Sequence, residues 1–238
     1  MTDPSARLDE IVARHRLDSA ARGRLAALLA VVADDPVAPT SVREPARAVD
    51  VHLADSLVAL DLAPVAAATS IADLGAGAGF PGLALAAARP EARVSAVESS
   101  RRKCAFLERA VHAAGLPNAR VVCMRGEEWR DGAESCDLVT ARALAPLPVV
   151  VEYAAPLLAM GGALVAWKGR RDAVEEAQGS ASAALLGLEA GDVVEVAPFA
   201  GAEHRHLHVF HKAAATPPGY PRRPGAASKR PLGVRSRK

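Results

Sequence analysis

A glycine-rich loop follows a short apolar run near the middle of the chain. Residues 71–82 read Ile-Ala-Asp-Leu-Gly-Ala-Gly-Ala-Gly-Phe-Pro-Gly, and an Ala-rich stretch begins at about Leu83. Glycines let a backbone approach a ligand closely, and a helix that follows such a loop presents free N–H groups to it. The segment therefore predicts a binding site for a nucleotide-like ligand, with Gly75 and Gly77 in contact with that ligand.

Two cofactor classes fit this loop. Gly77, Gly79 and Gly82 match the G-x-G-x-x-G pattern of dinucleotide-binding proteins. The wider frame D-x-G-x-G-x-G, which begins at Asp73, is the pattern of S-adenosylmethionine-dependent methyltransferases. An acid at this position would attract the ammonium group of that cofactor and would repel a pyrophosphate. The loop thus favours S-adenosylmethionine, with Asp73 as one of its contacts.

Two further segments would complete a cofactor site. Glu98 ends the next predicted strand, where an acid accepts hydrogen bonds from ribose hydroxyls in either cofactor class. Gly126 follows the third strand and would admit the adenine ring, while Glu127 or a backbone group beside it would read the adenine amine. A plain surface turn at 125–129 is the alternative interpretation.

The elements that must position these residues alternate in type from Ser70 onward. Short β-type apolar runs are followed by stretches rich in Ala and Leu, which are typical of helices. Seven strands with helices between most of them predict an α/β fold with a doubly wound, Rossmann-like sheet of the class I methyltransferase kind. The last two strands should pair antiparallel, because the residues between them are too few for a crossover helix. The predicted strands cover 70–74, 93–98, 119–124, 136–140, 162–167, 192–197 and 206–212.

The chain divides into three predicted regions. Residues 1–45 form an N-terminal helical extension and linker, with two short helices over 6–33. Residues 46–212 form the cofactor-binding methyltransferase domain, which opens with a helix over 46–60. Residues 213–238 form a basic, flexible tail that is rich in Pro and Gly and should lack regular structure.

The formal net charge of +2 conceals an uneven distribution. All 27 acidic residues lie before Lys212, and with 22 of the 29 basic residues they give the chain through Lys212 a net charge of −5. The tail carries +7, which is typical either of an arm that binds polyanions or of a solvated terminus. Its basic residues are Arg222, Arg223, Lys229, Arg230, Arg235, Arg237 and Lys238.

Composition excludes several classes of protein. Half of the residues are apolar but only 3% are aromatic, which excludes a wholly disordered chain and argues against a broad base-stacking platform. We expect a cytoplasmic protein without a membrane span or a signal segment. Cys104, Cys123 and Cys136 should be reduced core residues, and the four histidines in 204–211 should not bind a metal.

Five motifs together resemble one known family. The resemblance is to the RsmG family, also called GidB, and runs from about residue 42 to 232. That family methylates N7 of guanine-527 in the 530 loop of bacterial 16S ribosomal RNA. Departures from its pattern at 37–40 and 225–227 lie mostly in segments that face RNA. The motifs are His52-Leu-Ala-Asp-Ser-Leu, the loop of 73–82 with its Phe-Pro-Gly ending, Thr140-Ala-Arg-Ala, Trp167-Lys-Gly and Tyr220-Pro-Arg-Arg.

The resemblance implies a 16S rRNA (guanine-N7)-methyltransferase that uses S-adenosylmethionine. Such an enzyme would bind 16S ribosomal RNA or the 30S subunit and would need no metal and no membrane. We expect a monomer. Arg142 would position the guanine and touch the cofactor, and Lys168 would hold an RNA phosphate. The implied cofactor contacts are Gly75, Phe80, Glu98, Gly126, Glu127 and Arg142. The tail residues predicted to bind RNA are Arg222, Arg223, Lys229 and Arg230.

The chemistry needs few side chains, because guanine N7 has an in-plane lone pair and carries no proton, so no general base is required.

Two other functions stay open: a small-molecule methyltransferase on the same fold, and a non-catalytic RNA-binding factor of ribosome assembly. His52, Asp55 and Ser56 share one helix face and would either line the substrate entrance or tie the helix to the core.

Overall fold

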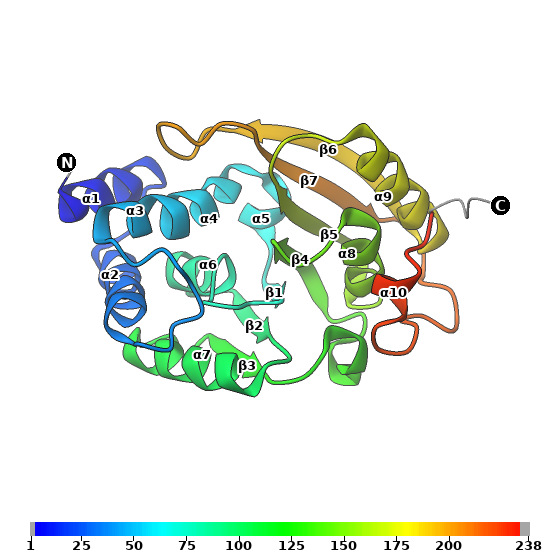
Figure 1. The fold of residues 1–238 in the computed structure, drawn as a ribbon, viewed down its shortest axis with the longest axis horizontal. Coiled ribbons are helices and arrows are strands. Elements are labelled where there is room, and N and C mark those ends of the chain that lie inside the picture. Colours follow the sequence, from blue (N-terminus) through cyan, green and yellow to red (C-terminus); the bar gives the residue numbers. More distant parts are fainter. Residues whose placement is uncertain (1–2, 234–238) are drawn as a thin grey trace.

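The computed structural model describes residues 3–233. A seven-stranded sheet in the order β3-β2-β1-β4-β5-β7-β6 lies at its centre (Figure 1). Neighbouring strands are parallel except β7, which runs antiparallel to both β5 and β6. The strands are β1 Ser70–Leu74, β2 Arg93–Val97, β3 Ala119–Val122, β4 Cys136–Arg142, β5 Leu158–Lys168, β6 Leu188–Val196 and β7 Arg205–Lys212. The prediction of a doubly wound α/β sheet with an antiparallel last pair is confirmed.

The strands β5 and β6 begin four residues earlier than predicted. The start of β6, Leu-Glu-Ala-Gly, is mostly exposed and holds a single large apolar residue, so the apolar pattern could not reveal it. In β5, Gly161 has a left-handed φ of +80°, and a register shift against β4 separates the first pairing at Leu158 from the regular ladder that starts at Ala163. Local apolar runs therefore mark the buried part of each strand rather than its full length.

Helices cover both faces of the sheet, as a parallel sheet requires. In Figure 1, α6 and α7 lie beside β1–β3 together with the N-terminal helices, and α8 and α9 lie over the other half of the sheet. The helices are α1 Pro4–Arg14, α2 Ser19–Asp34, α3 Pro45–Ala48, α4 Asp55–Leu57, α5 Ala63–Ala67, α6 Gly82–Ala88, α7 Arg101–Ala113, α8 Leu147–Ala154, α9 Ala173–Leu185 and α10 Ala226–Lys229.

Side-chain alternation along the strands divides the core in two. In β1, Ile71 packs into the cluster formed with α2, α6 and α7, whereas Ala72 packs into the cluster formed with α8 and α9. The same alternation separates Val209 from Phe210 in β7. Since successive strand residues face opposite sides of a sheet, each strand contributes to both cores.

The two predicted N-terminal helices are present. Asp18 caps α2 by accepting a hydrogen bond from the Ala21 N–H at 2.7 Å. This cap fixes the start of α2 after the short connection that follows α1. The predicted helix over 46–60 is less regular: α3 and α4 are joined by a π-helical turn, Val49–Ala54. Such wide turns are frequent at functional sites, and this one carries His52.

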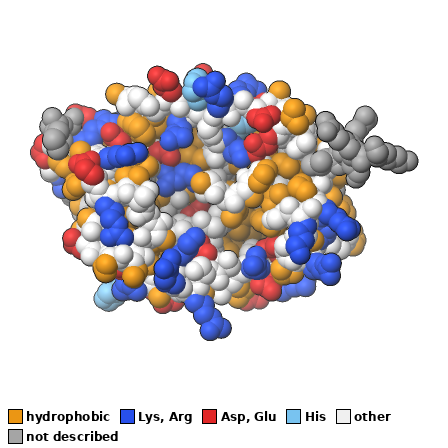
Figure 2. Space-filling view, viewed as in Figure 1, with side chains coloured by type: hydrophobic (Ala, Val, Ile, Leu, Met, Phe, Trp, Pro, Cys, Tyr) orange, Lys and Arg blue, Asp and Glu red, His pale blue; other side chains and the backbone are white. Residues whose placement is uncertain are grey.

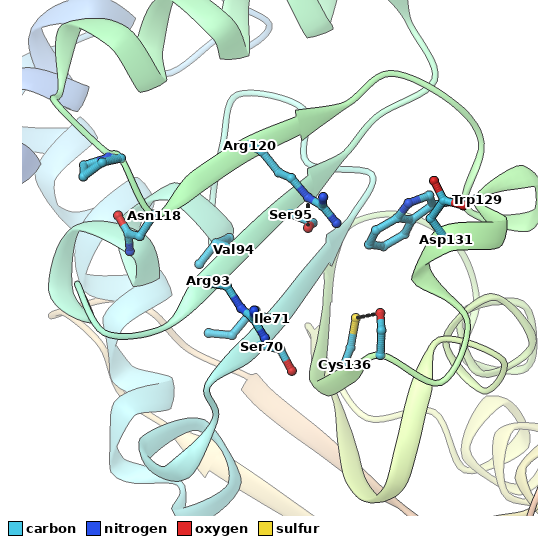
Figure 3. Close-up of a pocket in the computed structure, with 12 residues that line it drawn as sticks. Ser70, Ile71, Arg93, Val94, Ser95, Asn118, Arg120, Trp129, Asp131 and Cys136 are labelled. Carbon is cyan, nitrogen blue, oxygen red and sulfur yellow. Dashed lines mark hydrogen bonds between the residues drawn. The ribbon is translucent and has the colours of Figure 1, made fainter.

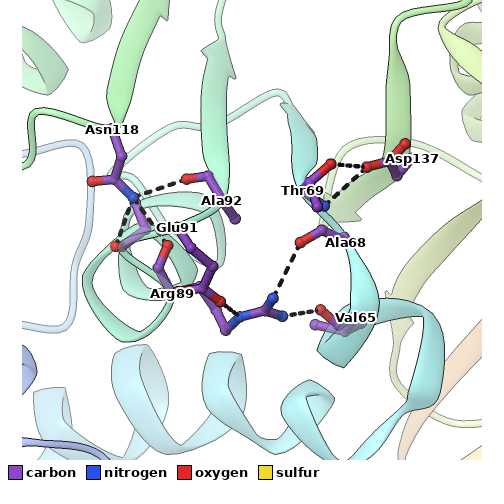
Figure 4. A network of polar contacts seen from close by, with 9 residues as sticks. Val65, Ala68, Thr69, Arg89, Glu91, Ala92, Asn118 and Asp137 are labelled. Atoms are coloured by element: carbon purple, nitrogen blue, oxygen red, sulfur yellow. Dashed lines mark hydrogen bonds and ion pairs between the residues drawn. The ribbon is translucent and has the colours of Figure 1, made fainter.

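Polar contacts fasten the connections at the amino ends of the strands (Figure 4). The Asn118 side-chain amide donates to the carbonyls of Ala86, Arg89 and Ala92. Arg89 itself donates to Val65 O at 2.6 Å and to Ala68 O at 3.2 Å. These bonds satisfy carbonyls at the ends of α5 and α6 and so fix the edge of the sheet opposite the glycine loop.

The C-terminal segment differs from the predicted unstructured tail. Residues 226–229 form α10, and Ser182 Oγ donates a hydrogen bond to Leu232 O at 2.8 Å. Tyr220 and Leu232 pack against the core on the α8 side. The segment is thus folded onto the domain through Gly233. Arg235, Arg237 and Lys238 lie outside the described residues.

The prediction of three reduced cysteines is wrong for two of them. Cys104 and Cys123 form a disulfide, with their Cα atoms 5.8 Å apart, and Cys136 is free and buried. Cys104 lies in the first turn of α7 and Cys123 directly follows β3. Because β2 and β3 are parallel neighbours, the segments that follow their carboxyl ends meet, although the two cysteines are separated by 19 positions.

Candidate functional site

The glycine loop between β1 and α6 turns tightly at three positions. Gly75, Gly77 and Gly79 have φ values of +68°, +55° and +93°, in the region that side chains rarely adopt. The N–H groups of Gly75 and Ala76 both donate to Val97 O, at 2.9 and 3.1 Å. The loop is therefore fixed against the end of β2, with a geometry that requires glycine.

Asp73 holds the far end of this loop. Its side chain is buried, and its oxygens accept hydrogen bonds from the Thr140 hydroxyl at 2.7 Å and from the Gly82 N–H at 3.0 Å. Burial raises the pKa of the Asp73 carboxyl to about 6, against the opposing effect of these hydrogen bonds. The structure thus places Asp73 as a clamp between β1, β4 and the start of α6.

The raised pKa of Asp73 predicts a pH dependence of stability. The folded protein binds this proton more tightly than the unfolded chain, so the free energy of unfolding falls as the pH rises from about 4 to about 6. With a shift from 3.8 to about 6, this contribution is roughly 3 kcal/mol. Urea denaturation of wild type and Asp73→Asn from pH 4 to 7.5 measures it.

The difference in unfolding free energy between wild type and Asp73→Asn should decrease with rising pH. Asp137 provides a matched control, because hydrogen bonds from Thr69 lower the pKa of its carboxyl. The corresponding difference for Asp137→Asn should not fall over the measured range, because the rise expected from a lowered pKa is centred below pH 3.8. A pH-independent difference for Asp73→Asn would contradict the assignment of a raised pKa.

A pocket of about 350 Å³ opens at the carboxyl ends of β1, β2 and β4, beside the glycine loop. Four of the predicted cofactor contacts line it: Gly75, Glu98, Gly126 and Glu127. Ligands bind at this edge of open α/β sheets. The structure therefore brings together the predicted ribose acid and the predicted adenine subsite.

The walls of this pocket fit a nucleoside. Glu98 is buried and accepts hydrogen bonds from the N–H groups of Gly77 at 3.2 Å and Ser100 at 2.8 Å, so its carboxylate is fixed at the pocket edge. A side chain at Gly75 would come within 2.6 Å of Leu144 Cδ1, and one at Gly126 within 3.0 Å of Leu74 Cδ2. The site thus combines two positions where a side chain would not fit, Gly75 and Gly126, with acids that accept hydrogen bonds from hydroxyl or amino groups.

A second cavity, also of about 350 Å³, lies at the opposite ends of the strands (Figure 3). Ser70, Arg93 and Cys136 are the first residues of β1, β2 and β4 and line it, together with Trp129 and Arg120. The Arg120 guanidinium lies 5.7 Å from the centre of the Trp129 ring. Because this cavity lies at the amino ends of the parallel strands, it is not the predicted cofactor site.

Arg142 ends β4 and is held by two contacts from the segment before β1. Its guanidinium donates to Asp55 Oδ2 at 2.8 Å and to Val51 O at 3.0 Å. Arg205 approaches the other oxygen of Asp55 at 3.5 Å. Arg142 thus pairs with Asp55, whereas the buried acid Glu152 pairs with Arg222.

His52 and Phe80 stack next to this cluster. Their ring centroids are 4.7 Å apart with the planes 10° from parallel. Burial lowers the pKa of His52, whose Nε2 lies 3.0 Å from Val42 O. Ser56 Oγ donates to His52 O. Of the two predicted roles, these contacts favour attachment of the helix to the core.

The remaining predicted residues are dispersed. Lys168 lies at the end of β5 and pairs with Glu175 at 2.5 Å. Arg222 pairs with Glu152 rather than facing solvent, whereas Arg223, Lys229 and Arg230 are exposed. The predicted cofactor contacts that do not line the pocket are Asp73, Gly77, Phe80 and Arg142. Among the residues that do line it, Lys103, Tyr153 and Ser228 carry polar groups that sequence reasoning missed.

A family model described as rRNA small subunit methyltransferase G matches residues 31–207. The chain belongs to this GidB family. It is 39% identical over 196 residues to a ribosomal RNA small subunit methyltransferase G of Desulfitobacterium hafniense, covering 81% of each chain. It is 41% identical to the protein of the same name from Rubrobacter xylanophilus, covering 80% of this chain and 75% of that one. The resemblance inferred from the motifs is confirmed.

Solved structures show the fold of the GidB chain to be that of class I methyltransferases. A predicted O-methyltransferase from Agrobacterium tumefaciens has a TM-score of 0.51 and 26% identity, over 68% of this chain and 80% of that one. Fibrillarin from Aeropyrum pernix with natively bound S-adenosyl-L-methionine has a TM-score of 0.51 and 21% identity, over 66% and 72%. S-adenosylmethionine is thus the cofactor expected of this methyltransferase, and four of its predicted contacts line the pocket at the glycine loop.

Residues 3–233 contain no helix long and apolar enough to cross a membrane. Over the same range, no cluster of three or more His, Cys, Asp or Glu side chains is arranged to hold a metal ion.

Proposed function

We propose that this chain transfers the methyl group of S-adenosylmethionine to N7 of a guanine, guanine-527 of 16S ribosomal RNA. The observation that carries the proposal is the position of Arg142. It stands at the end of the strand next to β1, held by Asp55 and adjoining a pocket that fits the cofactor, within a chain of the GidB family. The named relatives are methyltransferases of small-subunit ribosomal RNA.

In the proposed reaction the protein aligns rather than activates. The cofactor supplies an electrophilic methyl group. Guanine N7 attacks with its own lone pair, so no residue has to remove a proton. Arg142 would hold guanine O6 or a phosphate so that N7 points at the pocket, and the stacked rings of His52 and Phe80 join the segment that carries Asp55 to the glycine loop. The residues around Arg142 suit this role, since Asp55 fixes the guanidinium from behind.

Basic side chains around the pocket support an RNA substrate. Lys103 and Arg125 line the pocket itself, and Figure 2 shows Lys and Arg side chains around a hollow in the middle of the face. Arg223, Lys229 and Arg230 are exposed and are proposed as phosphate contacts. The predicted RNA contact of Lys168 stays a prediction, because its ammonium group is occupied by Glu175.

The proposal predicts that methyl transfer to purified 30S particles weakens with salt. Each phosphate contact releases counterions, so raising the salt from about 50 to 200 mM should increase the KM for the particle by tenfold or more. Tritium transfer from labelled S-adenosylmethionine measures this increase. A salt-independent KM would contradict recognition of the RNA through its phosphates, and no transfer at all would favour one of the two alternatives, the small-molecule methyltransferase or the assembly factor.

The experiment that tests the site of modification is mapping N7-methylguanine in 16S ribosomal RNA. RNA from cells with the gene should carry the modification at guanine-527, and RNA from cells without it should not. Complementation with the wild-type gene should restore it. Unchanged modification after deletion of the gene would refute the proposed substrate.

A further inference from the structure

The C-terminal segment 220–232 reaches the cofactor pocket and contributes Ser228 to its lining. The Gly225 N–H donates a hydrogen bond to Glu127 Oε1 at 3.2 Å. Ser228 Oγ lies 3.1 Å from the Tyr153 hydroxyl, and both residues line the pocket. The segment thus contacts the pocket on the side where Gly126 and Glu127 lie, which is the side that we assign to the adenine.

One ion pair attaches the segment 220–232 to the rest of the domain. The Arg222 guanidinium donates to both oxygens of Glu152, from Nε at 2.7 Å and from a terminal nitrogen at 2.5 Å. Glu152 is 1% exposed and lies in the otherwise apolar helix α8, next to Tyr153. A buried carboxylate requires such a partner, and the two-point geometry fixes the orientation of both groups.

The same arginine also closes the segment on itself. The guanidinium of Arg222 donates to Arg230 O at 2.8 Å, so that it joins both ends of the turn that carries Gly225 and Ser228. The hydrogen bonds to Glu152 raise the pKa of Arg222 further. Arg223, its neighbour in the chain, is exposed instead. Two adjacent arginines with the same charge therefore have different environments.

We propose that the Arg222–Glu152 ion pair is a positioning element of the adenine subsite and that residues 220–232 confer cofactor specificity. Arg222 holds Gly225 against Glu127, and Gly225 orients the Glu127 carboxylate towards the exocyclic amine of adenine. A carboxylate accepts a hydrogen bond from that amine and repels the carbonyl oxygen of hypoxanthine at the same position. The inference rests on the proposed cofactor site, and it assigns to Arg222 a role other than RNA binding.

The test compares two ligands that differ at this one group, S-adenosylhomocysteine and S-inosylhomocysteine. Isothermal titration calorimetry gives both Kd values for wild type, Arg222→Gln and the matched control Arg223→Gln. Wild type should prefer the adenine ligand by at least about tenfold, as expected for a hydrogen bond to a charged group. In Arg222→Gln the preference should fall to about twofold or less, mainly through weaker binding of the adenine ligand. In Arg223→Gln it should equal that of wild type.

The ratio of the two Kd values separates positioning from general damage. Arg222→Gln leaves Glu152 buried without its cation, so the double variant Arg222→Gln/Glu152→Gln, which removes both charges, is measured as well. The double variant should also lose the preference for the adenine ligand, and its Tm should be closer to that of wild type than the Tm of Arg222→Gln is. Glu127→Gln should lose the preference with the ion pair intact. These results together support the positioning role.

Two outcomes overturn the proposal. One is an unchanged preference in Arg222→Gln and the double variant. The other is an equal weakening of both ligands, which would mean a structural role alone. If Arg222→Gln instead keeps the preference but loses affinity for a 16S ribosomal RNA fragment, Arg222 is an RNA contact as the sequence predicted. None of these measurements depends on methyl transfer, so failure of the proposed RNA substrate would leave this test intact.

Discussion

Replacing Arg142 by alanine is expected to lower the rate of methyl transfer to 30S particles by about a hundredfold or more, since small misplacements of a reacting group have effects of this size. The reason lies in how Arg142 is held. Asp55 and the Val51 carbonyl fix its guanidinium at 2.8 and 3.0 Å, so it would act as a rigid donor next to the proposed methyl-transfer site. Single-turnover transfer from labelled S-adenosylmethionine measures the rate.

Removal of Arg142 also affects Asp55, which is buried. Loss of one partner of a buried pair typically costs about 3 to 5 kcal/mol, although Arg205 at 3.5 Å reduces the cost here. Arg142→Gln/Asp55→Asn therefore serves as a second variant, inactive but with both charges removed. Arg205→Ala leaves the pair with Arg142 in place and should affect the rate far less.

The Arg142 prediction would be contradicted by a variant that stays folded and retains at least about a third of the wild-type rate. Arg142→Lys gives an additional criterion. One terminal nitrogen of Arg142 contacts both Asp55 and Val51 O, and lysine keeps a charge that could do the same but lacks the other N–H groups of the planar guanidinium that we assign to the substrate. A rate close to that of alanine in this variant would show that geometry, rather than charge, is the contribution of this residue.

The sheet was predictable because strands buried on both faces read as apolar runs, and the carboxyl ends of neighbouring parallel strands necessarily meet. The same reasoning placed Glu98 and Glu127 beside the glycine loop, where the pocket lies. What this reasoning could not supply is the direction of each side chain. Asp73 was predicted to face the cofactor, whereas it points to Gly82.

Strand alternation holds the missing signal for Asp73. Ile71 packs on the α6 side of the sheet, and a residue two positions later lies on the same face. This alternation predicts that Asp73 faces α6, on the side opposite the core in which Ala72 and Leu74 pack. The acid in D-x-G-x-G-x-G is in this chain a loop anchor.

The C-terminal segment was misjudged because its partner lies far away in sequence. Residues rich in Pro, Gly and Arg are typical of a flexible tail, and Arg222 contacts a residue 70 positions earlier. A signal existed in α8, where Glu152 interrupts an otherwise apolar run. A buried acid needs a cation, and this requirement indicates a missing contact without identifying the arginine that makes it.

The Cys104–Cys123 disulfide also could not be predicted, because it depends on which strands are neighbours in the sheet.

Gly82→Ala is expected to disrupt the glycine loop although alanine favours helices. Gly82 is the first residue of α6, and a Cβ atom there would lie 2.6 Å from Asp73 Cβ and 2.7 Å from Asp73 Oδ2. No side chain fits so close to a buried carboxylate, and the hydrogen bond from the Gly82 N–H at 3.0 Å would break. Overpacking and the unpaired acceptor together should destabilise the protein by about 3 kcal/mol or more.

For a domain of this size, that loss lowers the Tm by roughly 10 °C, and S-adenosylhomocysteine should bind at least about tenfold more weakly because the loop no longer fits the end of β2. Gly23→Ala is the matched control, since Gly23 is also helical and a Cβ there would have nothing within 4 Å. It should raise the Tm by about 2 to 4 °C, because alanine stabilises an exposed helical position by up to about 1 kcal/mol. If Gly82→Ala lowers the Tm and Gly23→Ala raises it, the glycine that ends the Phe-Pro-Gly motif is there because a side chain would collide with Asp73. A Tm for Gly82→Ala equal to or above that of wild type would refute this explanation.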